Sequence, residues 1–529
     1  MRHPIFLVGA LLFALPVSAA PARGAIEASR PRLGVIVVID QLRADEIEKH
    51  KELWTAGFKR LVAEGRWYDN AYHSHGRTET AAGHATIGTG MVPRVHGVVD
   101  KDIYDRVTNK TVNLCHIGKE PCSPHILLVP TVGDRLKEVS PKSVVVSMSE
   151  KGRAAALLGG TKTDLVAWFN DDTMALMGRA SAGSKPVPAW LEQAFHKTVN
   201  ASTINGSWEL PKLPKSYASW KDDSPGERGC GHGLVFPHQL PGNEDPKGRW
   251  RAWWCTPQSD EALEALVEVT IDKMHLGVDR TSDLLLVSFG AVDQVGHSFG
   301  PNSVERLAVL KSLDETLGRL LHKLETVTHG DVVLMLTADH GVTPTLYTLH
   351  QQDKRAGLVD LGDVRKYLEE GLNKEFGART NYIDEISIPY IYLDDALDAE
   401  MKRRVASATA TLLRGYPHVA RAWAVASMKG DSDDQIERLM YLNSNPERSG
   451  DVALVLEPNF THKRPYYGEL GAQHGSPWKD DRQVPVLFWG AGVKQGRVKD
   501  EVTVIDAIRT MADRLGIPPD PRGGQPLVQ

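Results

Sequence analysis

Five short segments of the sequence end apolar runs with residue types that bind metal ions. They supply three aspartates, three histidines and one threonine: Asp40, Thr80, Asp293, His297, Asp339, His340 and His474. One zinc ion usually takes four ligands, so these residues are too many for one ion and about right for two. The threonine hydroxyl is a poor nucleophile at neutral pH, and coordination to a metal ion is a direct way to activate it. We therefore expect a two-metal site with an activated hydroxyl group.

The spacing of these residues has ordinary explanations when each motif is taken alone. Asp293 and His297 stand four residues apart, which places both side chains on one face of a helix. Asp339 and His340 are adjacent, so they serve different metals or one metal through a turn. His474 looks like a loop ligand, although a surface histidine is the alternative. A lone Asp after a strand is commonly a turn residue or a helix cap, so only the combination is specific.

Thr80 opens a run of small residues that could begin a helix. The free N–H groups and the positive dipole end of a helix start favour a phosphate or a sulfate. The alternative is that Thr80 is merely the N-cap residue of this helix, with Thr78 as an equivalent candidate.

The elements that must position these residues are strands rich in β-branched residues, each followed by a helical stretch. This alternation predicts an α/β fold with three layers, in which helices cover both faces of a central, mostly parallel sheet. The longest helical periodicity covers 304–324. Ligands of open parallel sheets bind beyond the carboxyl ends of the strands, so Asp40, Asp293 and Asp339 should meet at one edge. The predicted strands are 33–40, 143–148, 284–288, 332–336 and 484–489.

Two segments interrupt this pattern and are interpreted as insertions into one catalytic domain, 20–529. The first, about 154–278, is rich in tryptophan and is expected to form a cap over the site. Its aromatic side chains are expected to form the core of that cap, with a substrate platform as the alternative. The second insertion, about 346–467, contains a predicted strand at 387–392 and a predicted helix at 399–413.

Composition limits the kind of partner. The chain has 529 residues, 41% of them hydrophobic, and a formal charge of −5 at pH 7. These values are typical of a globular protein and give no sign of a nucleic-acid binder. An anionic substrate would therefore have to be held by a local cluster of cations or metal ions.

The N-terminal residues are typical of an export signal. Arg2 and His3 form a short basic region, 5–15 is apolar, and Val17-Ser18-Ala19 resembles a cleavage site, so the expected signal peptide is 1–19. An uncleaved amphipathic start is the alternative. We expect no membrane anchor, because no cysteine stands at the cleavage point and no later stretch approaches the roughly 20 apolar residues of a membrane helix. A periplasmic or secreted location follows.

The four cysteines form an even set, which suits an oxidising compartment. Pairing Cys115 with Cys122 and Cys230 with Cys255 closes the shortest loops, although three connectivities are possible. A thiolate zinc site is the alternative, and the absence of a Cys-x-x-Cys pair argues against it.

In combination, the motifs resemble the zinc-dependent alkaline phosphatase superfamily, and most closely the exported PafA-type alkaline phosphatases that use threonine as nucleophile. The similarity runs from about 33 to 516 and implies an alkaline-phosphatase-like fold. The motifs that carry it are Ile39-Asp40-Gln41-Leu42-Arg43, the run from Thr80, 93–97, Ser149-Glu150-Lys151-Gly152-Arg153, 291–297, 337–341 and Gln473-His474-Gly475.

The resemblance implies two Zn²⁺ ions per chain. The first would be held by Asp293, His297 and His474. The second would be held by Asp40, Asp339, His340 and the oxygen of Thr80. Two metal ions roughly 4 Å apart can stabilise the entering and leaving oxygens of an in-line displacement. The resemblance also implies that Thr80 attacks phosphorus and forms a phosphothreonine intermediate.

Three further side chains concern the phosphate group. Lys151 and Arg153 match the pair that contacts the non-bridging phosphate oxygens in these enzymes, and an arginine fork suits a monoester dianion. Related diesterases generally lack this pair. The chain departs from the family at Lys101, where an asparagine normally donates a hydrogen bond to phosphate. A lysine could replace that donor, but it must be desolvated near two cations or point away.

The resemblance therefore implies an exported phosphatase of broad specificity that scavenges phosphate from small-molecule phosphate monoesters, with a monomer favoured. A phosphodiesterase or nucleotide pyrophosphatase on the same metal core is the enzymatic alternative. Thr80 argues against a sulfatase, which carries Cys or Ser there, and a phosphoglycerate mutase would normally carry Ser. A periplasmic phosphate-binding or metal-binding protein is the alternative outside enzymes, and it would need no nucleophile.

Overall fold

The computed structural model describes part of the chain. The described residues are 30–113, 122–170, 172–180, 186–200, 206–242, 244–464 and 469–528. The expected signal peptide at 1–19 and Cys115 lie outside them. Among the described residues, no helix has both the length and the apolar character needed to cross a membrane.

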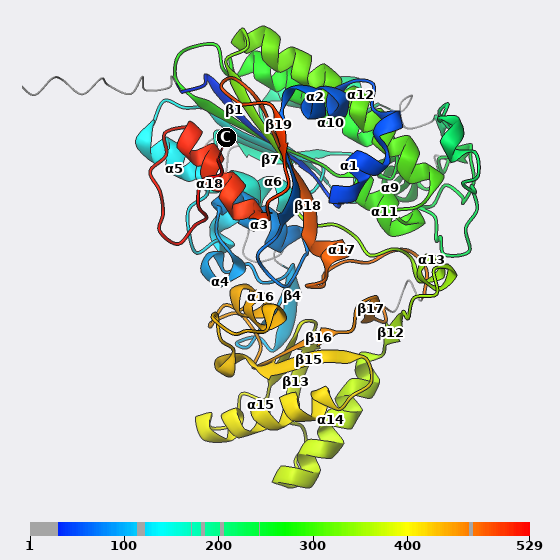
Figure 1. Ribbon diagram of the computed structural model, residues 1–529, viewed down its shortest axis with the longest axis vertical. Coiled ribbons are helices and arrows are strands. Elements are labelled where there is room, and N and C mark those ends of the chain that lie inside the picture. Colours follow the sequence, from blue (N-terminus) through cyan, green and yellow to red (C-terminus); the bar gives the residue numbers. More distant parts are fainter. Residues whose placement is uncertain are drawn as a thin grey trace, which may run out of the picture. The chain divides into compact units, whose positions relative to one another are not determined.

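A ten-stranded sheet organises the fold (Figure 1). Its order is β19-β2-β18-β11-β1-β10-β5-β6-β7, with β20 beside β2. The five strands from β11 to β6 in this order run parallel, and only β18 and β7 oppose them. The α/β fold with a mostly parallel sheet is thus confirmed. The strands are β1 (Leu33–Ile39), β2 (Arg66–Tyr72), β5 (Val145–Ser149), β6 (Leu165–Phe169), β7 (Leu176–Ala180), β10 (Asp283–Phe289), β11 (Val332–Thr337), β18 (Gln483–Gly490), β19 (Gly496–Val498) and β20 (Val502–Thr503).

The central strands form because they can be buried on both faces. Every residue of β1, β10 and β11 is buried, which requires the continuous apolar runs seen in the sequence. All five predicted strands are present, as β1, β5, β10, β11 and β18.

Helices form a layer on each face of this sheet (Figure 1). One layer contains α2 (Gly57–Glu64), α10 (Pro257–Lys273), α11 (Ala291–Phe299) and α12 (Val304–Thr328). The other contains α3 (Thr80–Thr89), α5 (Val132–Val139), α6 (Gly152–Gly159) and α18 (Val504–Arg514). The helix predicted at 304–324 is α12. Shorter elements of the same part are α1 (Ala44–Lys49), α4 (Pro93–His96), β3 (Asp102–Asp105), β4 (Lys110–Asn113) and α17 (Lys479–Arg482).

The tryptophan-rich segment at 154–278 contributes to the main sheet and to its core. Both β6 and β7 lie within it and extend the sheet. Trp208, Trp250, Trp253 and Trp254 belong to the same hydrophobic cluster as β1 and β10. These aromatic side chains are therefore part of the main core rather than a separate one. The remaining elements are α7 (Ala189–Thr198), β8 (Ser207–Trp208), β9 (His238–Gln239) and α9 (Pro246–Trp254).

The segment at 346–467 has a sheet and a hydrophobic cluster of its own. Its four-stranded antiparallel sheet has the order β13-β14-β16-β15, and two helices pack on it. The helix predicted at 399–413 is α15, but the strand predicted at 387–392 is only partly right, because 390–392 lie in β14 while Ser387 ends β13. Two antiparallel strands, β13 and β14, meet at a turn around Pro389, which lacks the N–H a ladder needs. The elements are α13 (Leu346–Gln351), β12 (Gly357–Val359), α14 (Leu361–Phe376), β13 (Ile383–Ser387), β14 (Tyr390–Leu393), α15 (Ala399–Arg414), β15 (Val419–Ala424), α16 (Gln435–Asn443), β16 (Val452–Leu456) and β17 (Phe460–His462).

Candidate active site

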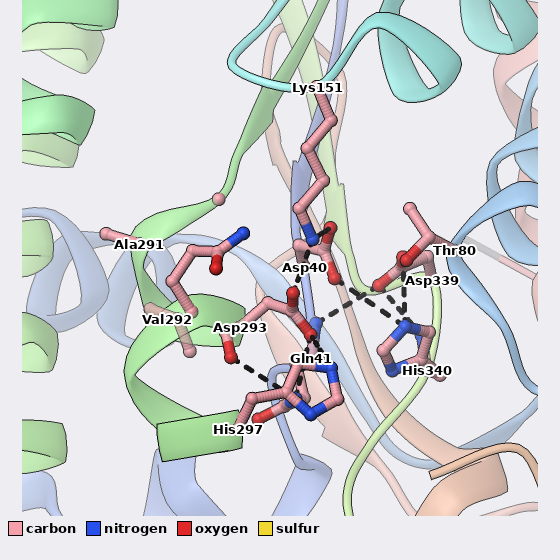
Figure 2. A network of polar contacts seen from close by, with 12 residues as sticks. Asp40, Gln41, Thr80, Lys151, Ala291, Val292, Asp293, His297, Asp339 and His340 are labelled. Carbon is pink, nitrogen blue, oxygen red and sulfur yellow. Dashed lines mark hydrogen bonds and ion pairs between the residues drawn. The ribbon is translucent and has the colours of Figure 1, made fainter. Parts of the chain in front are cut away.

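Three aspartates meet where the central parallel strands end. Asp40 directly follows β1, Asp339 follows β11, and Asp293 lies in the first turn of α11, just after β10. Because β1 pairs with both β10 and β11, their carboxyl ends are neighbours. Figure 2 shows the three side chains converging. The structure thus brings together the residues that the strand pattern expected at one edge.

One group of ligand atoms lies around His340. Its Nε2 is 3.6 Å from Asp40 Oδ1 and 3.3 Å from Asp339 Oδ2. All three residues are fully buried. Asp40 Oδ1 and His340 Nε2 have no hydrogen-bond partner among the described residues, and Asp339 Oδ2 lies 3.2 Å from His84 Nδ1. Buried polar atoms without partners are costly. This geometry fits a metal ion bound by Asp40, Asp339 and His340.

A second group lies around Asp293. His297 Nε2 is 3.3 Å from Asp293 Oδ1, as expected for residues four apart on a helix. His474 Nε2 is 3.9 Å from the same oxygen and 3.2 Å from His297 Nε2. His340 also lies within reach of Asp293 and His474. The two groups are therefore adjacent, with His340 between them.

The histidine rings are oriented as metal ligands. In His297, Nδ1 lies 2.9 Å from the carbonyl oxygen of Ala472. In His474, Nδ1 lies 2.8 Å from the carbonyl oxygen of Thr78. Only an N–H group can bond a carbonyl oxygen, so Nδ1 carries the proton and Nε2 keeps its lone pair. Burial lowers the pKa of His297 to about 4 and that of His474 well below its usual value, so both rings are neutral. Two lone pairs 3.2 Å apart repel each other unless a cation lies between them.

His340 follows the same pattern, because its Nδ1 lies 2.9 Å from the carbonyl oxygen of Gly341. Backbone hydrogen bonds of this kind orient ligating histidines in metalloproteins.

Lys151 connects the two groups (Figure 2). Its Nζ is 2.6 Å from Asp40 Oδ2 and also contacts Asp293 Oδ2. Burial favours neutral Asp293, yet the Lys151 ammonium holds the pKa of this carboxyl well below its usual value. Burial, with the carboxylates of Asp293 and Asp339, raises the pKa of Asp40 to about 7. One ammonium group thus faces three buried carboxyl groups. One positive charge cannot neutralise three carboxylates, so the site can bind further cations.

Thr80 is the first residue of α3, and its N-cap is Glu79. The alternative in which Thr80 or Thr78 caps the helix is wrong, since Glu79 holds that position and the Thr78 hydroxyl donates to Ser476 O at 2.9 Å. Thr80 is buried and lies beside Asp339 and His340 in Figure 2. The approach is possible because Gly83, one turn later, packs directly on the main chain of Asp339.

The three residues expected to bind the phosphate group lie in two different places. Lys151 is the N-cap of α6, and Arg153 lies in its first turn, close enough to affect the pKa of Lys151. Lys101 is half-buried and stands opposite Glu79. Burial alone would raise the pKa of Glu79. Nearby cations, of which the Lys101 ammonium has the largest effect, hold this pKa well below its usual value.

Gln41 supports the site and carries no role in the sequence-based prediction. Its backbone N–H donates to Asp339 Oδ1 at 3.1 Å, and its Nε2 donates to Asp293 Oδ1 at 2.8 Å. Its φ of 69° is rare for a residue other than glycine. Buried Arg306 donates to the carbonyl oxygen of Gln41 at 2.8 Å and fixes it. Two sequence signals could have pointed to Gln41: its position directly after Asp40 and its place in the Ile39–Arg43 motif.

Comparisons with known proteins show which family this chain belongs to. The model of the type I phosphodiesterase / nucleotide pyrophosphatase family matches residues 34–477. Alkaline phosphatase PhoK of Sphingomonas sp is 29% identical, covering 93% of this chain and 90% of that protein. Alkaline phosphatase PafA of Elizabethkingia meningoseptica is 28% identical, covering 99% and 97%.

Solved structures extend the agreement to three dimensions. Crystalline wild-type PafA superposes with a TM-score of 0.84 at 27% identity, covering 96% of this chain and 99% of that one. A PafA variant altered at a threonine, an asparagine, a lysine and an arginine gives 0.85 at 26%, with the same coverage. Murine ectonucleotide pyrophosphatase / phosphodiesterase 5 gives 0.56 at 16%, covering 93% and 97%, and shares the fold.

The fold and the site define a phosphoester hydrolase of the alkaline phosphatase superfamily. Within that superfamily, the chain belongs to the type I phosphodiesterase / nucleotide pyrophosphatase family. The alternative of a binding protein without catalytic activity is therefore set aside.

Proposed function

We propose that the protein is an exported alkaline phosphatase that hydrolyses phosphate monoesters through a phosphothreonine intermediate at Thr80, with two Zn²⁺ ions per chain. The observation that carries the proposal is the set of histidine Nε2 atoms and aspartate oxygens that face one buried locus beside Thr80. Asp and His ligands with neutral imidazoles suit zinc. Relatives named alkaline phosphatases over nearly the whole chain add support.

The chain offers two ligand sets for these ions. Asp293, His297 and His474 would hold the first ion. Asp40, Asp339, His340 and Thr80 Oγ1 would hold the second. When bound, the ions would lower the pKa of the threonine hydroxyl and stabilise charge on the entering and leaving oxygens.

The residues around the metal ligands would divide the remaining work. Thr80, at the start of α3, would attack phosphorus while the free N–H groups of that helix face the phosphate. Lys151 would lose part of its contact with Asp40 and Asp293 to metal ions and turn toward a phosphate oxygen. Arg153, in the first turn of α6, would bind a second oxygen with its fork. Water would then release phosphate from the threonine.

Lys101 would contribute less than the asparagine that it replaces. Its ammonium group interacts with the Glu79 carboxylate. This interaction lowers the attraction of Lys101 for phosphate. We propose it as an auxiliary positive charge rather than as a fixed donor.

A phosphodiesterase is the second candidate, and the family match favours it. The presence of Lys151 and Arg153 supports a phosphate monoester as the substrate. A monoester dianion has one more charged oxygen for these cations to bind than a diester monoanion. The test is the ratio of kcat/KM for an aryl phosphate to that for its methyl diester. A ratio above one is expected, and a preference for the diester would overturn the proposal.

Export and broad scavenging of phosphate from small esters complete the proposal. The disulfide between Cys230 and Cys255 and the bonded state of Cys122 support an oxidising compartment such as the periplasm or the outside of the cell. We also propose that the enzyme acts as a monomer on small-molecule esters, without a nucleic-acid polymer or a membrane anchor. Fractionation of the producing cells, with zinc analysis of the mature protein, tests location and metal together.

A further inference from the structure

A buried carboxyl group lies next to the phosphate-binding loop and has no part in the proposed reaction. Glu150 stands between the end of β5 and Lys151, and its side chain is 1% exposed. Neither of its oxygens accepts a hydrogen bond from an N–H group of the described residues. Asp260 on α10 interacts with this carboxyl group, and Asp260 Oδ2 is likewise buried without a hydrogen-bond donor among the described residues.

Asp260 connects this pair to the helix that carries two metal ligands. Its Oδ1 accepts hydrogen bonds of 3.1 Å from the backbone N–H groups of Gly290 and Ala291, at the start of α11. Gly290 also packs against Glu150, because a Cβ atom there would collide with Glu150 Oε2. The two carboxyl groups thus link the loop of Lys151 to the helix of Asp293 and His297.

Two carboxyl groups within hydrogen-bond distance in a buried site cannot both ionise. Asp260 is the better place for the charge, because two N–H groups donate to it and a helix begins there. Glu150 lacks such donors, so the shared proton belongs on Glu150.

We propose that Glu150 is a positioning residue that stays protonated and donates its proton to the Asp260 carboxylate. The pair holds one proton and one negative charge. It aligns α11 with the Lys151 loop and leaves the Lys151 ammonium free for Asp40, Asp293 and the substrate. The activity readouts below rest on the proposed phosphatase function.

The electrostatics of the pair agree with this assignment. Burial and the charge of Asp260 raise the pKa of Glu150 well above its usual value. Burial raises the pKa of Asp260 to about 6, while the hydrogen bonds it receives oppose that rise. The other charged groups that act on the pair are Lys151, which favours ionised Glu150, and Glu261, which disfavours ionised Asp260. An ionised Glu150 would compete with Asp40 and Asp293 for Lys151.

Infrared spectroscopy at pH 8 tests the proton directly, without any substrate. The wild-type holoenzyme should show the C=O stretch of a buried carboxylic acid, and this band should be missing from the E150Q variant. Absence of such a difference band would overturn the proposal. Because this readout needs no activity, it stands apart from any failure of the proposed function.

Two variants and their combination test the positioning role. E150Q keeps a neutral donor and should retain kcat/KM for an aryl phosphate within about twofold. D260N keeps an acceptor for the start of α11 but donates to Glu150, so that Glu150 ionises beside Lys151. We expect D260N to raise KM by about tenfold, which is the effect of a shift of one pKa unit. The loss in kcat should be smaller.

The double variant E150Q/D260N should restore KM to within about threefold of wild type, because both side chains are then neutral and paired. Equal zinc content in all variants checks that α11 remains in place. A D260N enzyme with wild-type KM, or a double variant no better than D260N, would overturn the proposal.

Discussion

At the scale of single residues, the site depends on one hydroxyl group. Thr80 is the proposed nucleophile among the seven residues that converge, and the other six are proposed to act only as metal ligands. The T80A variant should lose at least about 1,000-fold in kcat/KM, because neither an alcohol nor another nucleophile would remain next to the metals. T80S should retain more activity than T80A.

Two measurements distinguish loss of the nucleophile from loss of the site. Zinc content of T80A should stay close to that of wild type, since six other ligands remain. Acid quenching during turnover, followed by mass spectrometry, should find phosphate on Thr80 in the wild-type enzyme. A phosphate trapped on any other residue would contradict the mechanism.

The cations near the phosphate should contribute unequally. R153A should lower kcat/KM for a monoester by about 10-fold to 100-fold, the usual value of a charge-assisted hydrogen bond. K101A should lower kcat/KM by less than about threefold, because the Glu79 carboxylate already offsets part of the charge of the Lys101 ammonium. Measuring both variants on the same monoester and diester pair checks this. A larger loss in K101A than in R153A would show that Lys101 takes over the role of the family asparagine.

At the scale of elements, the close packing of α3 on the loop after β11 positions Thr80. Gly83 permits it, since a Cβ atom there would collide with the carbonyl oxygen of Asp339. G83A should therefore destabilise the protein by about 1–3 kcal/mol, the usual cost of overpacking, and should lower activity by shifting Thr80. Thermal unfolding and kcat/KM measure the two effects.

Gly206 provides a matched control, because a Cβ atom there would meet nothing within 4 Å. G206A should leave both the melting temperature and kcat/KM unchanged. If G83A behaves in the same way, the packing of α3 is more tolerant than this geometry implies.

The start of α12 gives a prediction about pH. Glu305 is fully buried, 3.2 Å from His238, and burial raises its pKa to about 8 from a usual value of 4.5. The carboxyl group of Asp222 adds to this rise, and Glu227 is a further carboxyl group nearby. The folded state holds the proton more tightly than the unfolded state. The stability from this group is therefore complete below pH 4.5 and is lost as the pH rises to about 8.

Glutamine cannot ionise, so E305Q should show a smaller fall in melting temperature between pH 5 and pH 9 than wild type. The control is E315Q, because Glu315 is a half-exposed residue on the same helix. Identical slopes for wild type and E305Q would mean that Glu305 is ionised in the folded protein.

The sequence predicts the elements well where the apolar pattern has one interpretation. The central strands are uninterrupted apolar runs, and a parallel sheet buries such runs on both faces. The pattern does not give direction, so the reversal of β18 could not be foreseen. The strand expected at 387–392 is only partly right because the alternation continues on both sides of the turn at Pro389.

The same limit applies to the site. The seven proposed ligands are visible in the sequence because each follows a strand or matches a family motif. The supporting contacts are not, because they join residues far apart in the chain. Gln41 contacts Asp293 across 252 residues, and Asp260 contacts Gly290 across 30. Such contacts depend on packing that no local pattern encodes.

At the scale of the whole molecule, we expect the proposed metal site to contribute to stability as well. Asp40, Asp293 and Asp339 are buried close together, and Lys151 is the one ammonium or guanidinium group that forms ion pairs with them among the described residues. Without metal ions, these carboxyl groups repel each other, and Asp40 gains a pKa of about 7. Zinc that binds the folded state alone stabilises it by about 3 kcal/mol at a free concentration 100 times its Kd.

Chelation should therefore lower the melting temperature by about 5 °C or more and abolish activity, and added zinc should restore both. Calcium should restore neither, because it prefers oxygen ligands in larger number than this site provides. The mature enzyme should contain two zinc ions per chain, and H474A should contain close to one, since His474 belongs to the first site alone. A melting temperature unchanged by chelation, with zinc present beforehand, would mean that the metal ions are not held by these buried groups.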